Sequence, residues 1–214
     1  MNYDVVVIGG GHAGIEASSA SARLGLRTAL VTFMKTNIGE MSCNPSIGGL
    51  GKGHLVREID ALDGVMARAI DKAGTQFRVL NASKGAAVQG PRAQADRTLY
   101  KKAVNEILAE QKTLDIIEDE AVEILFDDKF ENVCGVVLKS NGIINCKSVV
   151  LTTGTFLNGV MHTGEEQTKG GRVGEKASYG ITESLKKAGF EILRLKTGTP
   201  ARLSMATINY DGLE

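Results

Sequence analysis

The feature that most constrains this fold is a glycine-rich turn between a short apolar run and a helical pattern. Residues 3–8 are apolar and rich in valine, three glycines follow, and small apolar residues recur at helical spacing over residues 13–24. This order predicts a strand, a tight turn and a helix. A second apolar run at residues 26–32 completes a βαβ unit, whose two strands must be parallel.

The turn fits the dinucleotide-binding pattern G-x-G-x-x-G in its required place between a strand and a helix. It consists of Gly9, Gly10, Gly11, His12, Ala13 and Gly14. The first glycine of the pattern allows the tight turn, the second lets a pyrophosphate approach the backbone, and the third lets helix and strand pack closely. The helix N-terminus adds N–H donors for the anion. The turn therefore predicts a dinucleotide-binding site.

The second strand ends without the acidic residue that usually binds the ribose hydroxyls. Thr32 stands at that position, and no Asp or Glu occurs between Glu16 and Glu40. A threonine hydroxyl binds a ribose hydroxyl more weakly than a carboxylate does. We therefore expect other groups to help hold the adenosine end.

Residues 114–146 favour FAD over NAD as the dinucleotide. They change to a period of two and to β-branched residues, and the Ser140-Asn141-Gly142 step is typical of a hairpin. A strand ending in Leu151-Thr152-Thr153-Gly154 follows. The expected fold is α/β: it resembles the Rossmann-like FAD-binding domain of the glutathione-reductase type, with a small antiparallel β-meander and a helical and loop insert.

The length of 214 residues predicts about one domain. Its parts are a βαβ unit at 1–32, a loop and helical insert at about 33–113, the β-meander and closing strand at about 114–154, and a loop, helix and strand at 155–214. The last helix is expected at about 178–188 and the last strand at 190–193.

The region around residues 55–74 predicts one amphipathic helix with a basic face. Arg57, Arg68 and Lys72 fall together on that face. The chain has a net charge of zero, but residues 52–102 hold ten Lys and Arg against five Asp and Glu. This segment is a candidate for contact with an anionic partner, and the alternative is a solvated helix face.

The cysteines and histidines indicate no metal site. Cys43, Cys134 and Cys146 match neither a disulfide framework nor a zinc pattern, and the three histidines are scattered. Cys134 and Cys146 lie in strand patterns and are expected to pack, whereas Cys43 lies in a glycine-rich loop. No apolar run is long enough to span a membrane. The odd number and the spacing of the cysteines favour a reducing, cytoplasmic setting.

Five segments of the chain make it similar to the MnmG (GidA) family. They are Gly-Gly-Gly-His-Ala-Gly at 9–14, Met-Ser-Cys-Asn-Pro-Ser-Ile-Gly-Gly-Leu-Gly-Lys-Gly-His-Leu at 41–55, Leu-Asn-Ala-Ser-Lys-Gly at 80–85, Arg-Ala-Gln-Ala-Asp-Arg at 92–97 and Arg-Leu-Lys-Thr-Gly-Thr-Pro at 194–200. The family's chain is far longer. The resemblance therefore implies the N-terminal part of an FAD-binding domain, with no complete second domain.

The resemblance implies an FAD-dependent enzyme that modifies tRNA at C5 of the wobble uridine, giving 5-carboxymethylaminomethyl- or aminomethyl-uridine. It implies NADH and methylene-tetrahydrofolate as further cofactors of the full-length enzyme. It also implies a cytoplasmic homodimer that forms a heterotetramer with an MnmE-type GTPase. We expect the 214 residues alone to be inactive.

The resemblance also assigns site residues. The turn at 9–14 matches the family's pyrophosphate loop, Val122 the strand position whose backbone reads the adenine, and Ser178 a later FAD contact. Thr32 matches the family as well, so the missing acid is in keeping with it. Arg57, Arg68 and Lys72 become candidate contacts to tRNA phosphates.

Cys43 is the candidate nucleophile on chemical grounds. C5 of uracil is a poor nucleophile until a thiolate adds at C6, and such a thiolate needs an electropositive, partly open setting. Lys52 and nearby glycine N–H groups could provide that setting. The alternative is a structural thiol beside the flavin.

Three other functions remain open. The folate- and FAD-dependent tRNA uridine methyltransferase shares the glycine loop but not the block at 41–55. A flavin oxidoreductase of the fumarate-reductase type shares only the fold, which does not fix function. A third is a catalytically incomplete FAD-binding module.

Overall fold

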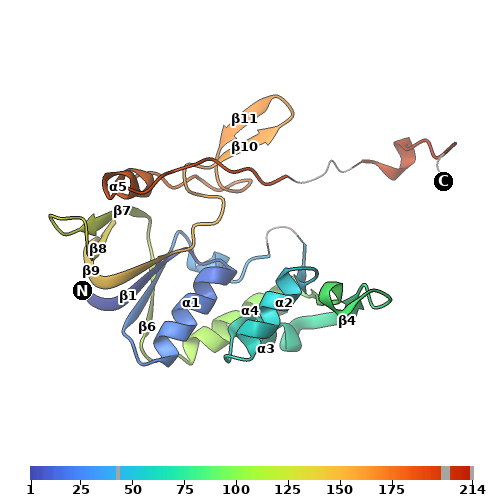
Figure 1. The fold of residues 1–214 in the computed structure, drawn as a ribbon, viewed down its shortest axis with the longest axis horizontal. Helices are drawn as coiled ribbons and strands as arrows, with labels where there is room; N and C mark the ends of the chain where they lie inside the picture. Colours follow the sequence, from blue (N-terminus) through green and yellow to red (C-terminus); the bar gives the residue numbers. More distant parts are fainter. Residues whose placement is uncertain (42–43, 199–202, 213–214) are drawn as a thin grey trace.

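The computed structural model describes residues 1–41, 44–198 and 203–212. Its main sheet has six strands in the order β6-β2-β1-β9-β8-β7 (Figure 1). Their bounds are β1 Asn2–Ile8, β2 Thr28–Thr32, β6 Leu114–Glu118, β7 Ala121–Phe126, β8 Val133–Leu138 and β9 Gly142–Leu151. β1 pairs in parallel with β2 and β9, and β2 pairs in parallel with β6. The carboxyl ends of these four strands therefore meet at one edge of the sheet.

Both faces of the parallel strands are buried, which explains their continuous apolar runs. Val5 and Val7 belong to a core shared with α1 (His12–Arg23), α3 (Val65–Ala73) and α4 (Arg97–Ala109). Val6 and Ile8 belong to a second core shared with the meander β7-β8-β9 and with α5 (Ile181–Lys187). The alternation of side chains along β1 thus joins two layers on opposite faces of the sheet.

The insert contains a second sheet, in addition to its helices. This small sheet is antiparallel, in the order β3 (Ser46–Gly48), β5 (Gly90–Ala95) and β4 (Gly74–Leu80). From its glycines and polar residues we expected residues 81–94 of the insert to form a loop, and this prediction was wrong for β5. β3 pairs only with Arg92, Ala93 and Gln94, so Pro91, near the start of β5, has no register partner in β3.

The prediction of one helix over residues 55–74 was also wrong. The chain forms α2 (Lys52–Asp60) and α3, which are separated at residues 61–64. Asp63 has a φ of 62°, which no helix residue adopts. The break leaves Leu62 76% exposed, so it is not part of an apolar helix face.

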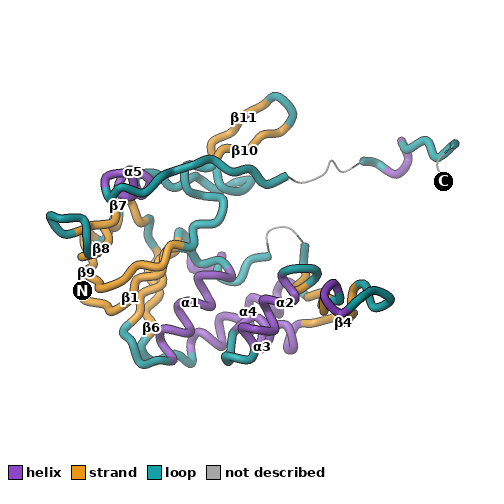
Figure 2. The backbone as a smooth tube through the Cα atoms, in the orientation of Figure 1, coloured by secondary structure: helices purple, strands orange, loops and turns teal. Residues whose placement is uncertain are grey.

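The meander and the C-terminal part differ from the prediction in three further details. β6 pairs with β2 in the parallel sheet and not with the meander, and residues 143–151 form one strand. Residues 155–170 include an unforeseen hairpin of β10 (Val160–Thr163) and β11 (Glu166–Lys169). The strand expected at 190–193 is absent, and Figure 2 shows this segment as loop. Without a neighbouring strand, its apolar residues cannot form a ladder.

The two cysteines that the structure describes differ in their surroundings. Cys146 is buried in the second core, and burial raises its pKa to about 11. Cys134 is exposed, so the prediction that it packs was wrong. Within the described ranges, no helix is long and apolar enough to cross a membrane.

Candidate functional site

A cavity of about 370 Å³ lies where the parallel strands end. Its walls include Gly9 after β1, Thr32 at the end of β2, Asp119 after β6 and Thr152 after β9. Doubly wound sheets bind ligands at this edge, and the volume is in the range of small-molecule sites. The cavity is therefore the candidate dinucleotide site.

The glycines of the turn are required for two different reasons. A Cβ on Gly9 would collide with the carbonyl oxygen of Thr152, and one on Gly14 would collide with the carbonyl oxygen of Gly9. Packing within the protein therefore demands these two glycines, and Gly9 also has a φ of 115°.

Gly11 differs, because the fold itself does not require a glycine there. Its φ is −75°, and a Cβ would meet no atom within 4 Å. Gly11 also lines the cavity. The open space beside its backbone fits a pyrophosphate group that comes too close for a side chain.

The N-terminus of α1 is prepared for an anion. Gly11 caps the helix without a side-chain acceptor, and the first turn contains no acidic residue. The first N–H groups of a helix have no partner within it and carry a partial positive charge. A phosphate oxygen at this end of the cavity would accept hydrogen bonds from them.

The acids that line the cavity near Thr32 are committed to other contacts. Asp119 accepts hydrogen bonds from the backbone N–H groups of Ser140 and Asn141, with Asn141 N at 2.9 Å. Burial raises the pKa of Asp119, but its hydrogen bonds outweigh this effect and hold the pKa below its usual value. Asp119 therefore anchors the β8–β9 hairpin as a carboxylate.

Glu40 is paired in a similar way. It accepts a hydrogen bond from Lys101 Nζ at 2.8 Å. This bond is the main reason why the pKa of Glu40 lies below its usual value. Glu175, the third acid among the described lining residues, accepts hydrogen bonds from Asn37 and Arg172. All three acids are therefore engaged within the protein and do not replace the acid that is missing at Thr32.

Of the two later FAD positions, only Ser178 lines the cavity. It is 4% exposed, and its N–H donates to Phe156 O at 2.8 Å. Val122 lies one residue beyond the lining residue Ala121, at a bulge where β7 and β8 shift register. The carbonyl oxygen of Val122 lies against Gly180, where a Cβ would collide with it, so the bulge places this backbone beside the start of α5.

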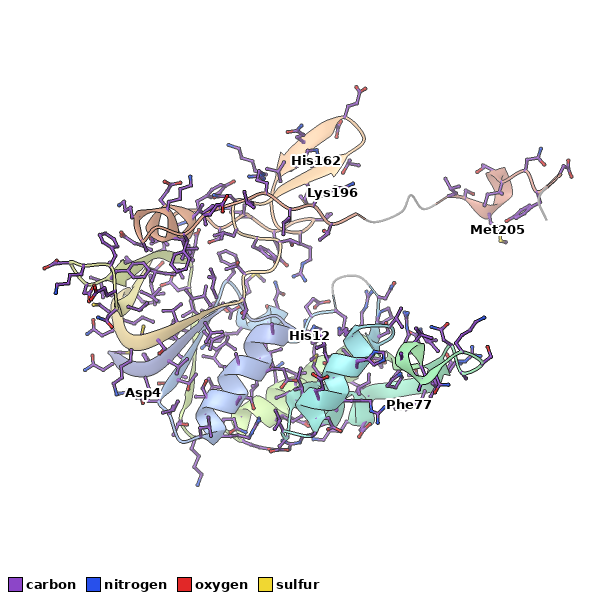
Figure 3. The ribbon with its side chains drawn as sticks, viewed as in Figure 1. Asp4, His12, Phe77, His162, Lys196 and Met205 are labelled. Atoms are coloured by element: carbon purple, nitrogen blue, oxygen red, sulfur yellow. The ribbon has the colours of Figure 1, made fainter. Side chains whose placement is uncertain are left out.

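His12 packs into the core from the first turn of α1. Its ring lies 5.7 Å from that of Tyr100, and its Nε2 is buried without a hydrogen-bond partner. Burial, and secondarily the charge of Lys52, lower the pKa of His12 to about 4. The imidazole is therefore neutral at physiological pH. Figure 3 shows His12 at the end of α1 that faces α2.

Several lining residues were not found from the sequence. Phe33 and Phe156 form a ring pair at 6.0 Å, and Glu175 accepts hydrogen bonds from Asn37 and Arg172. Phe33 could have been found because it follows a parallel strand. The other residues come from irregular segments, in which no periodic pattern marks them.

The candidate catalytic residue, Cys43, lies outside the described residues. The candidate tRNA contacts do not share one helix face, because Arg57 is on α2 and the other two are on α3. Arg68 pairs with Glu110 at 3.2 Å, and Lys72 pairs with Glu106 at 3.8 Å. The premise of a single basic face was therefore wrong, and two of the three charges are neutralised locally.

Comparisons with known proteins agree with this geometry. The family model "Glucose inhibited division protein A" matches residues 4–214. The tRNA uridine 5-carboxymethylaminomethyl modification enzyme MnmG of Granulibacter bethesdensis is 55% identical over 212 residues, which are 99% of this chain and 34% of that protein. A crystal structure of Aquifex aeolicus GidA matches with a TM-score of 0.87 and 49% identity, over 100% of this chain and 35% of that one.

A more distant match shows the fold alone. The GidA-related protein from Thermus thermophilus is 17% identical with a TM-score of 0.58, over 89% of this chain and 70% of that one. The parallel sheet and these likenesses confirm the predicted Rossmann-like α/β fold of the FAD-binding type.

Proposed function

Because this chain belongs to the glucose inhibited division protein A family, we propose that it is the FAD-binding part of an enzyme that modifies the wobble uridine of tRNA at C5. The chain spans about a third of the length of the curated relative that it matches. The observation that carries the proposal is the cavity at the carboxyl edge of the sheet. It has open space beside Gly11 and an α1 N-terminus that no side chain caps.

The chain's own residues account for the binding of FAD. Gly10, Gly11 and the first turn of α1 would hold the pyrophosphate, Thr32 a ribose hydroxyl, and the backbone of Val122 the adenine. Ser178 would contact the cofactor from the other wall. When bound, FAD supplies the redox chemistry of the enzyme.

Cys43 is the proposed nucleophile. Its thiolate would add to C6 of the uracil ring and make C5 nucleophilic, and C5 would then bond to the incoming one-carbon unit. Transfer of the C5 proton to a base would re-form the C5–C6 double bond and expel the thiolate from C6. Lys52 follows Cys43 by nine residues in the same glycine-rich loop sequence, and burial lowers the pKa of Lys52. The competing role for Cys43 is a structural thiol beside the flavin.

The remaining components belong to the complete enzyme. By resemblance, they are NADH as the reductant of the flavin, methylene-tetrahydrofolate as the one-carbon donor, and an MnmE-type GTPase that assembles with a homodimer in the cytoplasm. The name of the relative from Granulibacter bethesdensis supports a tRNA uridine as the substrate.

A cysteine exchange in the complete enzyme tests the proposal. Cys43→Ser should retain flavin absorbance after purification and lose modification of tRNA. Cys134→Ser is the matched control, since this exposed thiol lies on β8, away from the cavity-lining residues, and its loss should change neither.

Three results would contradict the proposal. A wild-type protein that retains no flavin would refute the FAD site. Unchanged modification by Cys43→Ser would refute the nucleophile and leave the structural thiol. Methylation in place of an aminomethyl-type product would favour the methyltransferase alternative.

A further inference from the structure

The small sheet β3-β5-β4 has one face against the helices and one face turned away from them. Ile47 and Ala93 pair across β3 and β5 and are both buried in the core with α3. Successive residues of a strand point to opposite faces. The residues between them therefore make up the other side, which we call the outer face. It consists of Ser46, Gly48, Gln76, Arg78, Leu80, Gly90, Arg92 and Gln94.

Two arginines lie directly opposite each other on the outer face. Arg78 of β4 is the register partner of Arg92 of β5. Like charges in this position destabilise an antiparallel pair. Strands normally place an acid or a neutral residue opposite an arginine, so this pair works against the stability of the sheet.

Within the part of the chain that the structure describes, neither arginine forms an ion pair, although Asp71 of α3 lines the same cavity of about 340 Å³ as both. Arg92 Nη2 donates to Ser46 Oγ at 3.0 Å, but Arg92 Nε is buried without a partner. Arg78 is exposed and forms no ion pair with a described residue. A buried N–H of a charged group that lacks an acceptor is costly. The arrangement is therefore unfavourable until an acceptor with negative charge arrives.

Arg68 of the insert, by contrast, lies beside acidic residues. On α3 it has Glu110 at 3.2 Å and Asp63 at 3.8 Å. The outer face contains no acidic residue: besides the arginines it has one hydroxyl, two amides, one leucine and two glycines. Gly48 of β3 is the register partner of Arg92 on its other side, and it has no side chain to place beside Arg92.

We propose that the outer face binds the phosphate backbone of RNA, with Arg78 and Arg92 sharing one phosphodiester. A phosphate carries a full charge and several acceptor oxygens, which suit two planar guanidinium groups. The surrounding segment 52–102 has ten basic against five acidic residues, which favours an anionic polymer over an apolar partner. This inference rests on the proposed function, in which tRNA is the substrate.

The position of the small sheet suits a contact with RNA that lies far from the reacting base. Figure 1 shows β4 at the far end of the insert from the main sheet, and none of the outer-face residues lines the cavity at the carboxyl edge. The outer face would therefore position the body of the RNA and would not touch the reacting base.

The test compares Arg78→Gln with Lys102→Gln in this chain. Both variants remove one positive charge from the insert, but Lys102 on α4 has Glu106 at 3.9 Å, whereas Arg78 has no ion pair with a described residue. We would measure tRNA binding by fluorescence anisotropy at several salt concentrations. Arg78→Gln should weaken binding about tenfold and reduce the salt slope by about 1. Lys102→Gln should leave the slope unchanged.

Thermal stability without RNA gives a second readout. Arg78→Gln should raise the melting temperature, because it removes the repulsion between the arginines. A lower melting temperature together with unchanged tRNA binding would overturn the proposal and make Arg78 structural. Unchanged tRNA binding with altered self-association would overturn it in favour of a protein partner.

Failure of the proposed function has a distinct signature. If the wild-type chain binds no tRNA, the proposed substrate and the RNA assignment both fail. Sodium pyrophosphate, compared with sodium chloride at equal ionic strength, then reports on the residues themselves. Stabilisation of the wild-type chain that is smaller in Arg78→Gln would show an anion site at this pair, and equal stabilisation would exclude one.

Discussion

His12 is an uncharged imidazole at a helix end that attracts negative charge. The ring packs against Tyr100 in the core, so a proton on it would be both desolvated and close to Lys52. A neutral side chain at this point leaves the positive potential of the α1 N-terminus to the backbone N–H groups alone.

The low pKa of His12 predicts a pH-dependent stability. The pKa is about 4 in the folded chain, against an ordinary value of 6.5 for histidine. Between pH 4 and pH 6.5 the unfolded chain binds more protons than the folded chain. The contribution of neutral His12 to the free energy of unfolding is therefore fully present above pH 6.5 and is lost as the pH falls toward 4. Its full size is ~3 kcal/mol. His12→Gln should remove this part of the pH dependence, as measured by urea unfolding from pH 7 to 4.5.

His162 provides the control for this measurement. It is exposed on the hairpin β10–β11, as Figure 3 shows, and His162→Gln should leave the pH profile of the wild type unchanged. A wild-type profile that already matches the profile of His12→Gln would contradict the account of a buried, neutral His12.

The start of α3 depends on a residue of another helix. Gly64 precedes α3 and has no capping side chain, but the carboxylate of Glu16 on α1 accepts hydrogen bonds from Val65 N at 2.9 Å and Met66 N at 2.7 Å. Glu16 thus supplies the cap that α3 lacks and fixes α3 against α1.

Removal of this cap should destabilise the fold. Glu16→Ala leaves two N–H groups without an acceptor and should lower the free energy of unfolding by about 2 kcal/mol. Glu58→Ala, on the exposed side of α2, should change it by less than about 0.5 kcal/mol. Equal effects of the two variants in chemical denaturation would show that Glu16 does not act as the cap.

The same contact shows why part of the fold could not be predicted from the sequence. The βαβ unit and the meander depend on local patterns, namely the glycine turn, β-branched runs and the Asn141-Gly142 hairpin, and these predictions were confirmed. The division between α2 and α3 depends on Glu16, which is 49 residues away from Val65. β5 forms because it pairs with β3 on one side and with β4 on the other. This long-range pairing overrides the Gly-Pro sequence at its start.

The candidate site shows the same limit. Gly9 to Gly11, Thr32 and Ser178 could be predicted because a known spacing or a resemblance marks them. Arg172 and Glu175 reach the cavity through the irregular segment after β11, for which the sequence contains no periodic signal.

At the scale of the molecule, two separate surfaces follow from one topology. Parallel strands with both faces covered present their carboxyl edge to ligands, and there the glycine turn meets loops from distant parts of the chain. Figure 1 shows β4 of the small sheet far from the main sheet. The candidate cofactor site and the proposed RNA contact therefore lie in different parts of the described chain.

The central claim is that the cavity holds the pyrophosphate of FAD against Gly11. Titration of FAD into the wild-type chain and into Gly11→Ala, followed by flavin fluorescence, tests it most directly. Gly11→Ala should fold with a stability within about 1 kcal/mol of the wild type, since its Cβ meets no protein atom. It should nevertheless bind FAD at least about tenfold more weakly, because the methyl group takes the space of the phosphate. A wild-type chain that does not bind FAD, or a Gly11→Ala variant that binds it equally well, would contradict the account.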